Sequence, residues 1–162
     1  MNGETWRRAW LWGVGLLVAV CGMGCGGSGF VVVTPPGFVE LDDQEPSYDY
    51  RATSADGVVV AVREIDHKPK GDLAFWVQAI RNRMRERAGY ALLDTVDVAT
   101  KSGLKGTQLR FGRDEKGESM LYTVTVFVTE DRIFLVEFGG TKEQMARQAK
   151  HLAWMLENFR LA

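Results

Sequence analysis

The strongest hydrophobic pattern of the chain lies between residues 120 and 159. Residues 120–128 and 133–138 alternate with a period of two and are rich in β-branched and aromatic side chains, which predicts a β-hairpin that turns at Glu130–Asp131. Gly139–Gly140 is expected to break the second strand. Thr141 and Gln144 then have the spacing of an N-terminal capping box. The helix that follows is predicted to bury one apolar stripe: Met145, Ala149, Leu152, Leu156 and Phe159.

Three further strands and a second helix are predicted upstream. The strands cover residues 38–41, 48–53 and 58–66, and Asp56–Gly57 has the sequence of a tight hairpin turn. Asp72 is the expected N-cap of a helix that runs to about Ala88, with Gly89 behind it. The stripe that this helix should bury consists of Leu73, Trp76, Val77, Ile80 and Met84.

Strands over residues 90–98 and 105–111 complete the predicted order of strands, helix, four strands and helix. Both helices are amphipathic, and the strand from residue 58 to 66 is apolar on both faces, which favours a sheet covered on both sides. The predicted class is α+β, a mostly antiparallel sheet of about six or seven strands sandwiched between two helices. Residues 36–162 are expected to form this single domain.

The N-terminal 24 residues have the pattern of an export signal, with Arg7 and Arg8 ahead of an apolar run of about sixteen residues. Gly24-Cys25 resembles a bacterial lipoprotein processing site, where cleavage precedes a cysteine that carries a diacylglycerol and, in that family, an amide-linked acyl chain such as palmitate. This resemblance implies residues 1–24 as signal peptide, Cys25 as the lipid attachment site, and residues 25–35 as lipidated cysteine and tether. Cys21 is the competing site, but bulky Val20 precedes it.

Other readings of this segment stay open. It also has features of an uncleaved membrane anchor or of an ordinary secretory signal, and the Arg7–Arg8 pair half matches a twin-arginine signal. The short apolar run at residues 30–33 has two interpretations. We favour a segment that docks along the domain over an exposed interaction strand, because four exposed apolar residues in a row promote aggregation.

The composition of the chain argues against several classes of partner and of active site. The chain holds 20 basic and 21 acidic residues, a balance that argues against nucleic acid and against electrostatic membrane binding by the folded part. Cys21 and Cys25 are its only cysteines, so a chain cleaved before Cys25 and acylated there has no free thiol for a disulfide, a metal or a nucleophile. Neither His67 nor His151 has the spacing of a metal site, and the acidic residues 42–49 lack the pattern of a calcium loop. We therefore expect no metal, no cofactor and no enzymatic activity.

The order of elements over residues 36–160 resembles the PsbP-like (Mog-type) fold. The segments that look similar are Pro36-Gly37-Phe38, Gly103-Leu104-Lys105-Gly106, Asp131-Arg132-Ile133-Phe134 and Asn158-Phe159. That group includes PsbP, a eukaryotic Ran-binding protein, and bacterial envelope lipoproteins of the DcrB and LpqN type. The resemblance implies a non-enzymatic binding or accessory role in the cell envelope.

Two functions are consistent with these features. The favoured one is a membrane-anchored lipoprotein that binds an envelope protein, and the alternative is a carrier of a small, lipid-like apolar ligand between the sheet and a helix. Two large aromatic residues lie nearly opposite the predicted buried stripes, Trp154 on the last helix and Phe75 on the first. One interpretation of Trp154 is that residues 30–33 or a loop fold over it. The other is a partner contact, because tryptophan is enriched at interface hot spots, and on this interpretation Trp154 and, as a weaker candidate, Phe75 are the predicted partner contacts.

Overall fold

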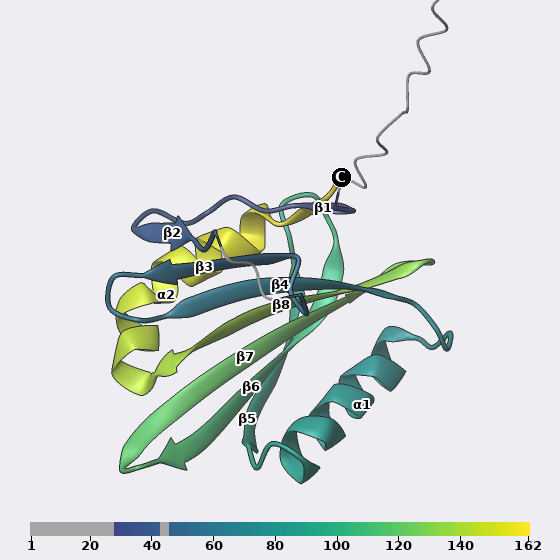
Figure 1. Cartoon of the computed structure of the whole chain (residues 1–162). Helices are drawn as coiled ribbons and strands as arrows, with labels where there is room; N and C mark the ends of the chain where they lie inside the picture. Colours follow the sequence, from purple (N-terminus) through teal and green to yellow (C-terminus); the bar gives the residue numbers. More distant parts are fainter. Residues whose placement is uncertain (1–27, 43–45) are drawn as a thin grey trace, which may run out of the picture.

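The computed structural model describes residues 28–42 and 46–162. These residues form one α/β unit, and the signal and lipid-attachment predictions, Cys25 included, lie outside them (Figure 1). Its elements are β1 (Phe30–Val31), β2 (Phe38–Glu40), β3 (Tyr50–Ser54), β4 (Val59–Asp66), α1 (Leu73–Glu86), β5 (Ala91–Ala99), β6 (Lys105–Glu115), β7 (Glu118–Val128), β8 (Arg132–Thr141), α2 (Lys142–Asn158) and β9 (Arg160–Leu161).

Seven strands form one antiparallel sheet in the order β2-β3-β4-β8-β7-β6-β5. Neighbouring strands of the sheet are consecutive in the chain everywhere except at β4 and β8, between which α1 and the three strands β5, β6 and β7 are inserted. The predicted α+β class, with about seven antiparallel strands between two helices, is confirmed.

Strand β8 contributes side chains to the cores under both helices. Phe134 and Val136 point into the core under α2, whereas Ile133 and Leu135 point into the core under α1. Successive side chains of a strand alternate between faces, so the two helices cover opposite faces of the sheet. They are also displaced from each other, because α1 lies beside β5 and α2 lies behind the opposite half of the sheet (Figure 1).

The hairpin from β7 to β8 and its junction with α2 follow the sequence pattern with one correction. Thr141 caps α2, and Gln144 completes the predicted capping box. Gly139–Gly140 does not break the strand, since β8 continues to Thr141 and both glycines pair with β7. A side chain at Gly139 would begin 3.2 Å from the ring of Tyr122, so this glycine makes room for the ring.

The buried side of α2 is rotated from the predicted stripe. Met145, Leu152 and Phe159 are buried as predicted, but Ala149 is exposed and Met155 is fully buried in its place. Apolar burial scales with the area removed from water, so a methionine gains more from the core position than an alanine does. The rotation leaves Ala149 at the edge of the helix, facing outward over the sheet.

The N-terminal segment docks as predicted. Phe30–Val31 forms a two-stranded antiparallel ribbon with Arg160–Leu161, which closes on the backbone bond from Ala162 to Gly29. The Phe30 ring stacks on Phe159 with the centroids 5.7 Å apart, and both side chains are buried. The start of the described chain is therefore fixed beside its C-terminus.

Helix α1 begins at the predicted N-cap and packs through the predicted apolar stripe. Asp72 accepts a hydrogen bond from the backbone N–H of Phe75 at 2.8 Å, as an N-cap should. The predicted stripe of α1 packs against the core of Leu109, Phe111 and Val124, although each stripe residue is only partly buried.

Candidate functional site

A hollow runs along α2. It has a volume of about 650 Å³ and lies between α2 and the sheet face formed by β5, β6 and β7. Its lining comes from the sheet and from one side of the helix: Val98, Ala99, Gln108, Arg110, Leu121, Thr123, Phe138, Lys142, Met145, Ala146, Ala149, Leu152, Ala153, Leu156 and Glu157. We call this surface the α2 groove.

The helical wall of the α2 groove is built from small side chains. Ala146, Ala149 and Ala153 line it and are exposed, while Leu156 continues the apolar wall toward the end of the helix. Their spacing of three and four residues places them on one side of the helix, next to the buried stripe. Exposed alanines in this arrangement leave the helix backbone open to close approach.

The floor of the α2 groove carries a polar ladder. Arg110 donates from Nε to the side-chain oxygen of Gln108 at 3.1 Å, and Gln108 donates onward to Thr125 at 3.2 Å. Arg110 also approaches Asp94 on the edge strand at 3.4 Å. Gln108 and Thr125 are buried, so the ladder satisfies polar groups beneath an otherwise apolar channel.

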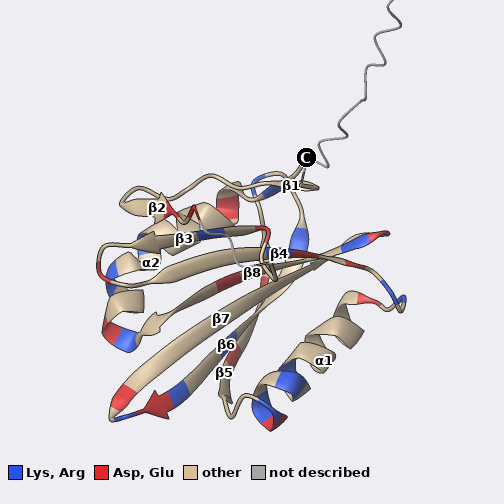
Figure 2. Ribbon diagram, viewed as in Figure 1, with Lys and Arg blue, Asp and Glu red and all other residues tan. Residues whose placement is uncertain are grey.

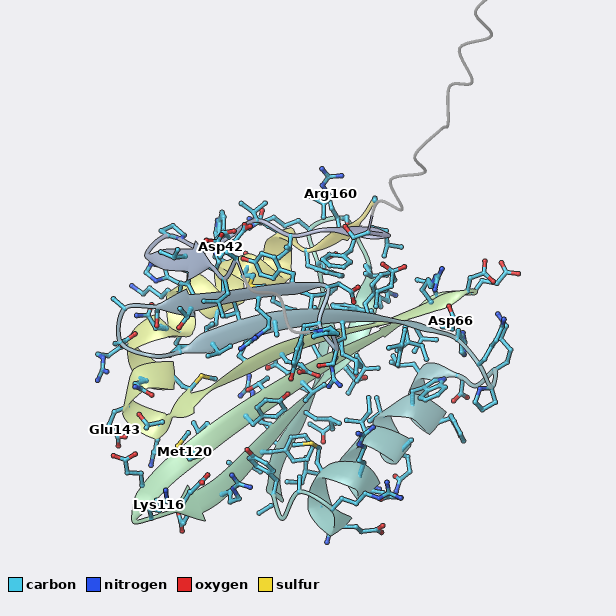
Figure 3. The ribbon with its side chains drawn as sticks, viewed as in Figure 1. Asp42, Asp66, Lys116, Met120, Glu143 and Arg160 are labelled. Atoms are coloured by element: carbon cyan, nitrogen blue, oxygen red, sulfur yellow. The ribbon has the colours of Figure 1, made fainter. Side chains whose placement is uncertain are left out.

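The two ends of the α2 groove differ in their charged groups. Lys142 lies at the first residue of α2, and within the described chain it has no ion-pair or hydrogen-bond partner. Glu157 lies near the last residue and approaches Lys101 at 3.6 Å. Figure 3 shows Glu143, next to Lys142, at the end of the molecule that carries the β6–β7 hairpin tip at Lys116, whereas Arg160 marks the other end.

A second polar cluster lies on the opposite face of the sheet. Glu137 is buried, and its carboxylate accepts hydrogen bonds from Tyr122 at 2.6 Å and from Nε of Arg63 at 3.0 Å. The guanidinium groups of Arg51 and Arg63 lie 5.5 and 5.3 Å from the centre of the Tyr48 ring. A hollow of only about 110 Å³ adjoins this cluster, so it has room for little more than a side chain.

Burial and neighbouring charges shift the pKa values of two residues in this cluster, Tyr122 and Arg63. Burial raises the pKa of Tyr122 far above its usual value of 10, and the neighbouring Glu137 charge raises it further. Burial alone would lower the pKa of Arg63, but the charge of Glu137 and its hydrogen bond, together with smaller contributions, leave that pKa raised. Along the ribbon of the described residues, basic and acidic positions are interspersed (Figure 2).

The residues predicted as partner contacts are separated by the fold. Phe75 lies on α1, with half of its surface exposed, and packs edge-on against Trp76. Trp154 lies on α2, is half-buried, and packs with Val32 against the core under that helix. Neither residue lines the α2 groove. Their role in partner binding stays a prediction.

Sequence reasoning missed the α2 groove because it assigned Ala149 to the core. The alanine spacing could have predicted the wall of the groove. Ala146, Ala149 and Ala153 form a second stripe at helical periodicity beside the buried stripe. The floor could not be recognised, because its residues come from three strands whose order the sequence does not give.

The histidines occupy unremarkable positions. His67 is buried, and its ring nitrogens lie 2.8 Å from the Thr129 carbonyl and 2.7 Å from the Gly71 carbonyl. His151 contacts Gln148 on the same helix. Within residues 28–42 and 46–162, no three His, Cys, Asp or Glu side chains come together as metal ligands. None of the helices in that part of the chain has the length and apolar character needed to cross a bilayer.

No known family model matches the sequence, and no curated protein matches it. Solved structures do match the fold. LpqN of Mycobacterium tuberculosis, described as involved in cell envelope biogenesis, aligns with a TM-score of 0.65 at 11% identity, over 85% of this chain and 87% of LpqN. The Ran-binding protein Mog1p of Saccharomyces cerevisiae aligns with a TM-score of 0.60 at 14% identity, over 85% and 92% of the two chains.

Cyanobacterial PsbP from Synechocystis sp. PCC 6803 gives a TM-score of 0.56 at 10% identity, over 83% of this chain and 87% of PsbP. These alignments confirm the predicted PsbP-like (Mog-type) fold. At such identities they show the fold alone.

Proposed function

We propose that this chain is a non-enzymatic, membrane-anchored lipoprotein of the cell envelope that binds a protein partner through the α2 groove. The observation that supports the proposal is the composition of the groove. Its walls are alanine, leucine, valine and phenylalanine side chains, which contribute burial of apolar area rather than proton transfer or nucleophilic attack. An exposed apolar surface rimmed by polar groups is typical of an interaction site.

The proposed anchor agrees with the way the domain begins. Cys25 precedes Gly29 by four residues, and Gly29 is fixed by its backbone N–H, which donates to Glu64 at 2.7 Å. Four extended residues reach about 14 Å at most. A lipid on Cys25 would therefore hold the domain close to the membrane surface. The role in cell envelope biogenesis described for LpqN, which shares this fold, is compatible with such a place.

The experiment that tests the anchor replaces each cysteine in turn. Cys25→Ser should leave the precursor unprocessed or move the protein out of the acylated membrane fraction, because the acceptor thiol is lost. Cys21→Ser is the matched control and should be processed and acylated normally. Metabolic labelling with an alkyne fatty acid, followed by fractionation, measures both steps. Normal acylation of Cys25→Ser with loss of acylation in Cys21→Ser would place the anchor at the other cysteine.

The alternative function is a carrier of a small apolar ligand. The volume of the α2 groove favours it, since about 650 Å³ lies within the range of ligand sites, about 300–1,000 Å³. A carrier should bind a fluorescent fatty acid with saturable stoichiometry, and Ala149→Trp should abolish that binding by filling the groove. The absence of saturable binding by the unaltered protein would exclude this alternative for fatty acids.

A further inference from the structure

We propose that the α2 groove receives one amphipathic α-helix of the partner protein, lying antiparallel to α2. This inference rests on the proposed function, because it names the structural class and the orientation of the partner that the groove binds. It is carried by three properties of the described residues: an unequal covering of the sheet, an alanine wall, and the opposite dipole ends of α2, with unpaired Lys142 at the positive one.

The covering of the sheet leaves room for one more helix. On one face, α1 packs across β5, β6 and β7. On the other face, α2 packs on β8 and β7, so the same outer strands β5 and β6 form an open floor. Neighbouring strands lie about 4.8 Å apart, so two strands give a floor of about 10 Å, close to the diameter of a helix. The molecule thus has a helix-sized gap in its second layer.

The wall of the groove fits a helix in length and in shape. From Lys142 to Glu157 the wall extends for about 22 Å, the length of a helix of four turns. Ala146, Ala149 and Ala153 are exposed along it. Small side chains allow helix axes to approach to the short end of the usual 8–10 Å range. Large side chains on the incoming helix can therefore reach the partly buried Leu121 and Val98 on the floor.

The charges at the ends set the orientation. Lys142 and the positive N-terminal end of α2 should attract acidic side chains and the negative C-terminal end of the incoming helix. At the other end of the groove the negative C-terminal end of α2 should attract the positive N-terminal end of the incoming helix, with Glu157 shared with Lys101. The incoming helix then runs from Glu157 toward Lys142, opposite to α2. Arg110 on the floor adds a second cationic group facing the channel, although it is shared with Asp94.

An extended peptide fits the site less well. A strand binds by pairing with a sheet edge. The backbones of β6 and β7 are paired on both sides, and only the outer side of β5 is open, so an added strand would lie beside the floor of the α2 groove and not on it. A lipid tail would lie against Gln108, Arg110 and Thr123, which interrupt the apolar floor. An amphipathic helix can present polar side chains to these three residues and apolar ones to the alanine wall.

Site-specific photo-crosslinking of the full-length anchored protein in its own membranes tests the inference. A benzophenone amino acid is placed at Ala146, Ala149 or Ala153 in the groove, and at Ala74, an exposed alanine on α1, as the matched control. The groove positions should each give an adduct with one protein. The adducts should fall on partner residues spaced three or four apart, and the Ala146 adduct should lie C-terminal to the Ala153 adduct.

Several outcomes would overturn the inference. These are adducts with lipid, adducts with a second copy of this chain, partner residues that alternate with a period of two, or the reverse order of the Ala146 and Ala153 adducts. Adducts with a protein from Ala74 alone would leave the envelope protein-binding role standing but would contradict the α2 groove as its site. The absence of protein adducts from all four positions would contradict the proposed function as well.

Two substitutions separate a binding defect from a folding defect. Ala149→Trp should reduce the Ala153 adduct at least tenfold with little change in the melting temperature, because Ala149 is exposed. Lys142→Glu should weaken the Ala146 adduct, yet it places a favourable negative charge at the first turn of α2 and should not destabilise the fold. An undiminished adduct in both variants, with the fold intact, would contradict docking in the groove.

Discussion

The hydroxyl of Tyr122 donates a 2.6 Å hydrogen bond to Oε2 of Glu137, on the sheet face opposite the α2 groove. The second oxygen of the same carboxylate is held by Arg63. Both side chains extend from the β7–β8 pair, beside Gly139, whose missing side chain leaves space for the Tyr122 ring. Because the Glu137 side chain is only 3% exposed, its charge depends on these two donors.

Removing one of the two donors should therefore be costly. Tyr122→Phe keeps the ring and deletes the hydroxyl, leaving an oxygen of Glu137 without that partner. The expected loss in the free energy of unfolding is about 1–3 kcal/mol, measured by urea denaturation. Tyr90→Phe is the matched control, because Tyr90 packs beside Tyr122 and no hydrogen bond of its hydroxyl is found in the described structure. Equal urea midpoints for the two variants would show that the hydroxyl contributes nothing.

The same contact predicts a dependence on alkaline pH. Burial, and then the Glu137 charge, raise the pKa of Tyr122 in the folded state above its value of 10 in the unfolded chain. The stability linked to its proton is therefore complete below pH 10 and is lost as the pH rises further, by up to about 1.4 kcal/mol per pH unit. Free energies of unfolding measured from pH 8.5 to 11.5 should fall less steeply for Tyr122→Phe. Parallel slopes would contradict the raised pKa.

The sequence could predict those parts of the fold that repeat a local pattern. Alternation and turn residues located the strands, and the Thr141–Gln144 and Asp72 caps located the helix starts, as found. It could not decide which edge of the α2 stripe is buried, since Ala149 and Met155 both lie beside Leu152 on the helix and only packing against the sheet separates them. The sequence could not predict the β1–β9 ribbon either, because each of its strands has only two residues and they lie at opposite ends of the described chain.

The two helices should differ in how much their central residues contribute. Leu152 is buried in the core under α2, so Leu152→Ala should lower the free energy of unfolding by about 2–5 kcal/mol. Ile80, the matching residue of α1, is only partly buried, so Ile80→Ala should cost less than Leu152→Ala. Urea midpoints measured side by side test the order. A larger loss for Ile80→Ala would mean that α1, rather than α2, forms the more tightly packed layer.

The last prediction concerns the two aromatic residues expected at a partner interface. Trp154 is half-buried against the core under α2, together with Val32 from the N-terminal segment. Trp154→Ala should therefore lower the melting temperature, because it removes packing from the core. Phe75 is half-exposed and touches mainly Gly71 and Trp76 on its own side of the molecule. Phe75→Ala should leave the melting temperature nearly unchanged.

The affinity for the partner gives a second test of Phe75 and Trp154. Phe75 lies on α1, away from the α2 groove, so a partner held in the groove alone should bind Phe75→Ala with unchanged affinity. A loss of about 2 kcal/mol or more, the size expected of an interface hot spot, would show that the partner also contacts α1. The fluorescence emission of labelled partner, titrated with each variant, measures this loss, and Ala74→Ser on the same exposed turn is the control for nonspecific effects. For Trp154→Ala, a binding loss is meaningful only beyond the loss explained by its lower stability. Unchanged affinity for Phe75→Ala, with a folded protein, would remove Phe75 from the interface.

A Trp154→Ala variant that keeps its melting temperature but loses binding would contradict the prediction for Trp154. It would show that Trp154 is a partner contact and that its half-buried ring contributes little to the stability of the core.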